Sequence, residues 1–341
     1  MIDDVYVRPL RETDLPTADR ILRLAFGTFV GIPDPMSFFG DADIVHTRFL
    51  ANPSAALAAE LNGEIVGSNF VTNWGSVGFF GPLSVRPDLW DRGIAKRLLE
   101  STIELFDKWG TKHAGLFTFS DSPKHIGLYQ KFGFWPSFLT AIMSKPVVAD
   151  QTTTTIIIRR RGEEIALPWS KYSELSEEDQ EECLNVCRTL TDSIYEGLDL
   201  KHEIAAVNTQ RLGDTVLLWE RNDDGAGEET RLVRRRLMGL AVCHCGVGSE
   251  AGSNTCYVKV GAVQPGPNAG QFFGQLLNVC EELARAQRMS RLVAGVNTGR
   301  HEAYRKMIAH GFRTDIQGVA MQRYNEPGYN RPDVYLIDDW R

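Results

Sequence analysis

Apolar and polar residues alternate along the first 145 residues in a way that predicts a mixed α/β domain. Apolar positions three or four apart predict a helix over 94–109, and Asn62-Gly63 between apolar runs predicts a hairpin over 55–77. The other expected elements are a strand leading into a capped helix within 7–26, strands at 78–85, 114–119 and 134–143, and a short helix at 123–132. The alternation of strands with helices places the chain in the α/β (α+β) class.

The second half of the chain carries a similar mixture of patterns. Residues 151–165 are mostly polar and charged, and we expect either a linker or an edge strand there. Hydrophilic, glycine-rich stretches at 222–229 and 246–254 indicate loops. The remaining expected elements are helices over 176–195, 272–284 and 301–308, and strands over 215–219, 237–245, 256–263 and 292–296.

The two halves share a register, which indicates an internal repeat. Val85 recurs as Val263, an offset of 263 − 85 = 178 positions. The same offset, without a gap, maps Pro87 onto Pro265, Leu98-Leu99 onto Leu276-Leu277, Glu104-Leu105 onto Glu282-Leu283, Gly133-Phe134 onto Gly311-Phe312 and Met143 onto Met321. We therefore predict a tandem duplication of one fold, with domains at 1–147 and 148–341. The alternative is two unrelated α/β domains whose short motifs match by coincidence.

The composition narrows the compartment and the partners. The length of 341 residues exceeds one typical domain, and the net charge of −7 argues against a general nucleic-acid surface. The N-terminus lacks a signal-peptide pattern, and no apolar run is long enough to cross a bilayer. Six cysteines in so long a chain are not a disulfide framework, so reduced thiols and a cytoplasmic protein are expected.

A candidate anion site lies where the strand at 78–85 leads into the helix at 94–109. Amide groups at a helix start have no partners within the helix, and the helix dipole adds positive potential there. Gly93 and Ala95 are small, so a diphosphate can approach the backbone, and Arg92 and Lys96 can add charge.

These residues resemble a known family. Val85-Arg86-Pro87, residues 93–95 and the run from Tyr129 to Phe134 together resemble the core of the GNAT acetyltransferase superfamily. The resemblance covers most of residues 1–145 and, more weakly, 160–325. It implies two tandem GNAT-like domains, each a mixed, mostly antiparallel sheet flanked by helices, with acetyl-CoA as co-substrate and no metal. The implied cofactor-binding residues are Leu83, Ser84, Val85, Asp91, Arg92, Gly93, Ile94, Ala95, Lys96 and Ser122. Trp90 and Ser122 depart from the family pattern, which has Gln or Arg and often Asn there.

Tyr129 is the candidate catalytic residue. In the family the matching tyrosine protonates the departing CoA thiolate, and a phenol within hydrogen-bond reach is suited to this step. The alternative is a tyrosine that only packs in the core. A backbone amide near Leu83 or Val85 is the implied oxyanion donor. The general base stays open among a water, Asp41, Asp43 and His125, and His125 is expected on a helix surface.

The second copy is expected to be degenerate. At the repeat offset, residues 93–95 become Gln271-Phe272-Phe273, and Tyr129 becomes Met307. Bulky side chains replace the open helix start, and methionine has no proton to donate. Gly266, Asn268 and Gly270 leave a weaker alternative, a residual anion site.

Other motifs suggest little chemistry. Cys243-His244-Cys245 could ligate a metal, but in a strand the thiols face one way and the imidazole the other. Cys183 and Cys187, one helical turn apart, are expected to pack. Phe26, Phe29, Phe38 and Phe39 are expected mainly to pack, with an acceptor pocket as the alternative.

Two functions of different kinds fit the sequence. The first is an N-acyltransferase that moves an acetyl or other small acyl group from CoA to a primary amine of a small molecule or peptide, by direct attack in a ternary complex. The second is a non-catalytic protein that binds or senses acyl-CoA, since a fold alone does not establish chemistry. Neither involves nucleic acid or a membrane, and the oligomeric state is open between a monomer with an internal pseudo-dimer and a homodimer.

Overall fold

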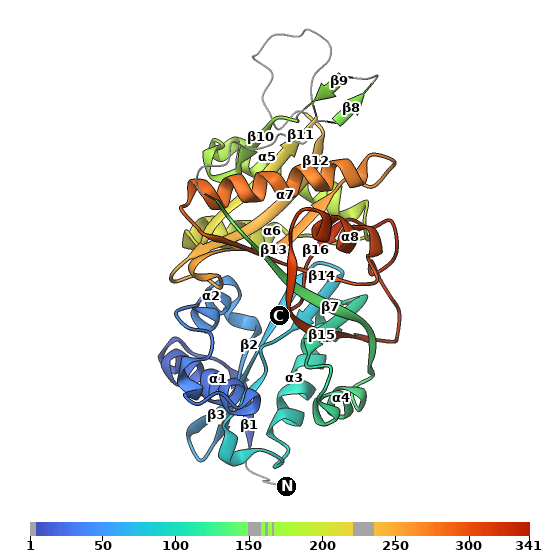
Figure 1. Cartoon of the computed structure of the whole chain (residues 1–341). Helices are drawn as coiled ribbons and strands as arrows, with labels where there is room; N and C mark the ends of the chain where they lie inside the picture. The colour runs from blue at the N-terminus through green and yellow to red at the C-terminus, as the bar shows by residue number, and fades with distance from the viewer. Residues whose placement is uncertain (1–4, 149–157, 161–162, 166, 221–234) are drawn as a thin grey trace.

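The structure is a computed structural model that describes residues 5–148, 158–160, 163–165, 167–220 and 235–341. The first half forms the lower part of Figure 1, with helices around a twisted sheet. Its strands are β1 (Tyr6–Pro9), β2 (Ala56–Leu61), β3 (Glu64–Trp74), β4 (Val77–Phe80), β5 (Ser84–Val85), β6 (His113–Thr118) and β7 (Phe134–Pro146). Its α-helices are α1 (Leu15–Val30), α2 (Ile44–Ala51), α3 (Ile94–Trp109) and α4 (Pro123–Gln130).

The second half forms the upper part of Figure 1 and has a similar order of elements. Its strands are β10 (Trp169–Lys171), β11 (Gly213–Trp219), β12 (Leu237–Gly246), β13 (Gly252–Val263), β14 (Arg291–Asn297), β15 (Arg313–Arg323) and β16 (Leu336–Ile337). Its α-helices are α5 (Glu177–Asp192), α6 (Lys201–Gln210), α7 (Ala269–Ala286) and α8 (His301–Ala309). A small separate hairpin, β8 (Ile158–Arg160) with β9 (Glu163–Ile165), falls in the predicted linker or edge strand, while residues 151–157 of that segment lie outside the described residues.

The two halves share one continuous 14-stranded sheet. Its order is β1-β2-β3-β4-β6-β15-β7-β14-β13-β12-β11-β10, with β5 beside β3 and β16 beside β13. Strand β15 of the second half lies between β6 and β7, and β7 of the first half lies between β15 and β14. The sequence predicted a sheet in each half; the structure joins them, because each half covers the other's sheet edge with its own long final strand.

The strand registers confirm the internal repeat. In the first half β4 runs parallel to β6 with Val77 opposite His113, and in the second half β13 runs parallel to β14 with Thr255 opposite Arg291. Both members of the second pair lie 178 positions after the first (255 − 77 and 291 − 113). Strands β7 and β15 pair antiparallel, and Thr140 faces its own counterpart, Gly318. The pseudo-twofold axis that relates the halves therefore passes through this pair.

Separate apolar clusters fix the helices on the sheet. Helix α3 packs on β2, β3 and β4 through Leu98, Leu99 and Phe106, which are buried with Phe80. Helices α7 and α8 pack on the second half's strands in the same way. Helices α1 and α2 share a cluster with β2 and β3, and α5 and α6 share one with β11 and β12.

One expected strand is wrong in detail. The single strand predicted over 78–85 is two short strands, β4 and β5, separated at Gly81 and Pro82. Gly81 has φ 143°, a backbone conformation that favours glycine, and its N–H donates to Phe70 O at 2.8 Å. The break turns the chain away from β6 and toward β3, where Ser84 pairs with Ser68. The domain boundary between residues 147 and 148 stays a prediction.

Candidate acyl-CoA site

The parallel strands β4 and β6 separate partway along their length, and we call this point of separation the cleft. The two parallel strands are paired from Val77 opposite His113 to Phe79 opposite Gly115. Beyond Phe79, the segment that follows β4 stays beside β3 and forms β5, while β6 continues beside β15. Of the predicted residues, Leu83, Ser84 and Val85 lie on one side of this split. The buried Ser84 hydroxyl lies 3.2 Å from that of Ser68, which fixes the strand from below.

The predicted diphosphate loop has the conformation that an anion site requires. Gly93 stands immediately before α3 with φ 87°, and a Cβ there would meet no atom within 4 Å. Asp91 also has positive φ, 63°, so the chain makes a tight turn into the helix. Ile94 is buried while Ala95 is half-buried, so the side chains anchor the turn and leave the first amide groups at the surface.

Trp90 stands where the family pattern has Gln or Arg, and it holds this loop through contacts of its own. Its ring is half-buried against the core under α3, and its indole Nε1–H donates to Val85 O at 2.8 Å. The side chain therefore ties the loop to the end of β5. We conclude that Trp90 has a structural role that keeps the turn beside the cleft.

Charged residues surround the loop. Asp91 accepts from Lys124 Nζ at 2.7 Å, which links the loop to the first turn of α4. Lys96 lies 3.6 Å from Glu100 on the exposed face of α3. Arg92 is exposed. Because these side chains are solvated, each contributes little by itself, and the backbone amides remain the main candidate anion ligands.

Tyr129 lies in the cleft, between the ends of β4 and β6. Its side chain is 8% exposed, and its ring lies 5.8 Å from that of Phe80, the last residue of β4. Burial raises the pKa of Tyr129 to about 12, partly offset by a hydrogen bond with the Thr118 side chain at the end of β6. The phenol is therefore protonated, the donor form, at any physiological pH.

His125 lies on α4 as a half-buried residue, so its side chain is less open than the expected surface position. It lies one turn before Tyr129 on α4, where positions four apart share a face. Its imidazole packs against Phe29 at 4.7 Å and Phe119 at 6.3 Å between ring centroids. Burial, with a smaller contribution from the charge of Lys124, lowers the pKa of His125, so the imidazole is neutral near pH 7. Ser122 caps the same helix by accepting from the His125 N–H.

The other two candidate bases are engaged elsewhere. Asp41 accepts hydrogen bonds from the N–H and hydroxyl of Ser253, in the second half, and these bonds lower its pKa. Asp43 caps α2 by accepting from the His46 N–H at 3.1 Å. Both carboxylates thus hold the start of α2, and the structure gives neither a contact with Tyr129 or His125.

The phenylalanines near α1 form one aromatic group beside His125. Phe26 stacks on Phe38 and lies tilted against Phe39, and Phe29 packs on Phe119 at 4.9 Å between ring centroids. These rings pack on one another, but Phe29 is 37% exposed and the other three are only half-buried, so the buried packing that the sequence predicted is wrong.

In the second half the equivalent cleft is filled by the chain itself. Strand β16 pairs with Gly261 and Ala262 of β13. These residues are the counterparts of Leu83 and Ser84, two of the predicted cofactor-binding positions (261 − 178 = 83). Arg300, the counterpart of Ser122, is fully buried and donates to Asp338 at 2.5 Å, just after β16. The segment around β16 therefore occupies, in the second half, the place beside β13 that corresponds to residues 83 and 84 of the first half.

The start of α7 also differs from the predicted diphosphate site. The helix begins at Ala269, the counterpart of Asp91, so helix replaces the turn. Phe273, the counterpart of Ala95, is buried beneath the ring of Tyr335 at 5.5 Å between centroids. A Cβ on Gly270 would meet the Tyr335 hydroxyl at 2.8 Å. Met307 is fully buried in the core. These contacts argue against a residual anion site here.

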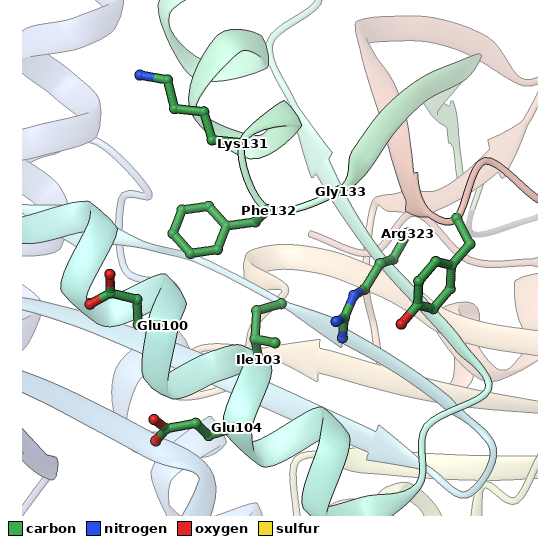
Figure 2. Close-up of a pocket in the computed structure, with 8 residues that line it drawn as sticks. Glu100, Ile103, Glu104, Lys131, Phe132, Gly133 and Arg323 are labelled. Carbon is green, nitrogen blue, oxygen red and sulfur yellow. The ribbon is translucent and has the colours of Figure 1, made fainter.

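Two further features bear on ligand binding. Within the described residues, no group of three or more His, Cys, Asp or Glu side chains could hold a metal ion. An open groove of about 500 Å³ lies between α3 and the start of β7. Its charged lining residues, shown in Figure 2, are Glu100, Glu104, Lys131 and Arg323. None of the predicted cofactor-binding residues lines it.

Comparison with known proteins decides the family. Residues 20–134 match the sequence model of the acetyltransferase (GNAT) family. The matched segment contains the loop at Gly93, the cleft strands and Tyr129. Residues 20–134 of this chain are therefore a GNAT-family domain.

Solved structures extend the GNAT fold over nearly the whole chain. A putative acetyltransferase from Pyrococcus horikoshii is 13% identical with a TM-score of 0.63, over 99% of this chain and 95% of that one. A GCN5-related N-acetyltransferase from Sphaerobacter thermophilus is 12% identical with a TM-score of 0.54, over 94% and 96%. A tandem GNAT protein from the clavulanic acid biosynthesis pathway is 12% identical with a TM-score of 0.55, over 93% and 98%. Identities this low establish the fold alone: a tandem GNAT fold.

Two negative findings complete the comparison. Among curated proteins, none matches the sequence. None of the helices in the described part of the chain has the length and apolar character needed to span a membrane.

Proposed function

We propose that this GNAT protein is an N-acyltransferase that moves an acetyl or other small acyl group from CoA to a primary amine, at one site in its first half. The observation that carries the proposal is the position of Tyr129. Its phenol is buried and protonated between the diverging ends of β4 and β6, close to the predicted diphosphate loop. Tyr129 also lies within the segment that matches the GNAT family model, at the position where the family resemblance implies the general acid.

The residues of the cleft suggest an order of events. The diphosphate of acyl-CoA binds at the amides around Gly93, and its acyl arm lies along residues 83–85. A neutral acceptor amine attacks the thioester carbonyl, and an amide of that strand stabilises the oxyanion. The carbon–sulfur bond breaks, and Tyr129 gives its proton to the sulfur. Burial favours neutral over ionised groups in this cleft, which disfavours a free thiolate.

We assign His125 as the base that takes the proton of the attacking amine. It shares the cleft face of α4 with Tyr129, one turn away, and its lowered pKa keeps it unprotonated at neutral pH. The aromatic group formed by Phe29 and Phe119 places it on the side of the cleft that faces α1.

The pH profile tests the function and this assignment together. Turnover, followed as amine-dependent release of the CoA thiol, should fall only as pH drops below the ordinary histidine pKa of 6.5, because burial lowers the pKa of His125. It should not fall on the alkaline side below about pH 11, because the pKa of Tyr129 is about 12. The acceptor should be an amine of low pKa, so that its own ionisation does not set the profile.

Replacing His125 with Asn is expected to lower kcat about tenfold and to remove the acidic limb of the profile. The effect is modest because water can replace a base for an amine that is already neutral. An unchanged limb in His125→Asn would assign the ionisation to another group. Absence of amine-dependent release over small amines, aminoglycosides, amino acids and peptides would favour the alternative, an acyl-CoA-binding protein without turnover.

A further inference from the structure

A buried chain of charges connects the second half to the predicted catalytic strand. Arg48 of α2 binds Glu250 with two hydrogen bonds, from Nε at 3.1 Å and from Nη2 at 2.7 Å. Glu250 also accepts from Lys259 Nζ at 2.8 Å, and that ammonium lies 2.8 Å from Glu203. Glu203 accepts in turn from Trp74 Nε1 of β3 at 3.2 Å.

One end of this chain of contacts, Arg48, reaches Gly81 at the end of β4, and the other end, Trp74, lies opposite Val77 at the start of β4. The side chains of its four charged members, Arg48, Glu250, Lys259 and Glu203, are between 2% and 7% exposed. Two positive and two negative charges balance. Burial opposes ionisation of Glu203, yet Lys259 lowers its pKa, and the pKa of Glu250 is likewise lowered against burial by Arg48 and Lys259. All four groups therefore stay charged.

Arg48 has two further partners that such an ion pair does not need. Its Nη1 donates to Gly81 O at 2.5 Å, and its Nη2 donates to Arg341 O at 2.5 Å. Gly81 is the residue at which β4 breaks before Leu83 and Ser84. Because the Gly81 N–H is held by Phe70 O, both backbone polar groups of this residue are fixed. The planar guanidinium is suited to hold a carboxylate and a carbonyl at once, which a lysine ammonium is not.

We infer that Arg48 is a positioning residue for the proposed acyl transfer, and that the second half acts on the first site by holding it through Glu250. The inference rests on the proposed function. It gives the degenerate copy a specific role, which is to fix the break in the strand that carries the expected oxyanion amide. Displacement of a reacting group by about an ångström can cost up to 100-fold in rate, so loss of this contact should reduce turnover.

The double variant Arg48→Met with Glu250→Gln tests the role. It removes one positive and one negative charge, and the amide oxygen of the glutamine introduced in place of Glu250 can still accept from Lys259. The buried Lys259–Glu203 pair therefore stays balanced, unlike in either single variant, where an unpaired charge would be buried. A matched control is Lys145→Met with Glu281→Gln, because that partly buried pair joins β7 to α7 at 2.6 Å without touching the first cleft.

The readouts are kcat per acetyl-CoA site titrated by calorimetry, the acetyl-CoA Kd, and the Tm. We expect the double variant to bind acetyl-CoA within about threefold of the wild type and to lose about tenfold in kcat, with kcat unchanged in the control. A kcat per titrated site equal to that of the wild type would make Arg48 purely structural. A loss confined to acetyl-CoA affinity would also overturn the positioning role. A wild-type protein without amine-dependent turnover would sink the proposed function itself.

Discussion

Replacing Tyr129 with Phe should lower kcat about 100-fold while leaving the Kd for acetyl-CoA nearly unchanged. The substitution keeps the ring against Phe80 and removes only the hydroxyl that faces Thr118. General acid catalysis by a positioned side chain typically contributes about 10²–10⁴-fold, and solvent can supply part of it. The measurements are steady-state turnover with a responsive amine and calorimetric titration of acetyl-CoA.

Tyr172→Phe is the matched control for this experiment. Tyr172 is also a buried tyrosine whose pKa burial raises to about 12, but it lies in the core around α5 in the second half. It should leave turnover unchanged. Wild-type kcat in Tyr129→Phe would show that Tyr129 only packs in the core. Equal losses in both variants would indicate a general effect of removing a buried hydroxyl.

Gly93→Asp should weaken acetyl-CoA binding about 100-fold, and Gly93→Asn much less. Asn and Asp both tolerate the left-handed conformation of Gly93, and a Cβ there meets no atom, so the pair differs mainly in charge. Two like charges about 4 Å apart near a protein surface repel by about 4 kcal/mol before salt screening, and about 2.8 kcal/mol corresponds to 100-fold.

The melting temperatures of the two Gly93 variants should rank in the opposite order to their affinities for acetyl-CoA. A carboxylate at a helix start interacts favourably with the helix dipole, by about 0.3–1 kcal/mol. Gly93→Asp should therefore melt at or above the temperature of Gly93→Asn while binding the cofactor more weakly. If both variants bind acetyl-CoA equally, the diphosphate does not lie at the start of α3. If the Asp variant melts well below the Asn variant, its weak binding would reflect unfolding.

Local signals in the sequence predicted much of the fold. Asn62 and Gly63 both have positive φ, as the expected two-residue hairpin between β2 and β3 requires. The helix that the apolar spacing predicted over 94–109 has the same first and last residues as α3. The strand predicted over 292–296 and the helix predicted over 301–308 match β14 and α8 to within one residue at each end.

The features that sequence reasoning missed depend on contacts between distant segments. Nothing local near Leu336 indicates that β16 would pair with β13, since the partner of Leu336, Ala262, is 74 residues away (336 − 262). Strand β7 pairs with β14 of the second half, and β15 pairs with β6 of the first half. These pairings join whole strands that are far apart in the sequence, so no local pattern indicates them. Helix α2 was missed because its buried face includes Arg48, a residue that is expected to be exposed until its partner Glu250, 202 positions away, is known.

The candidate site was predictable only in part. Gly93 and Tyr129 could be identified from the sequence because each belongs to a short run of residues that resembles a family motif, 93–95 and 129–134. Their roles, with those of the other predicted cofactor-binding residues, stay proposals. His125 was assigned to a surface because one turn of helix does not reveal Phe29 and Phe119, which come from other elements and change its environment.

The central claim is that each chain has one cofactor site, in the first half, because the chain itself fills the second cleft. Calorimetric titration of the purified protein with acetyl-CoA tests it most directly. We expect about one acetyl-CoA per chain, with binding strongly weakened in Gly93→Asp. About two sites per chain, or one site that Gly93→Asp leaves intact, would contradict it, and so would the absence of any binding.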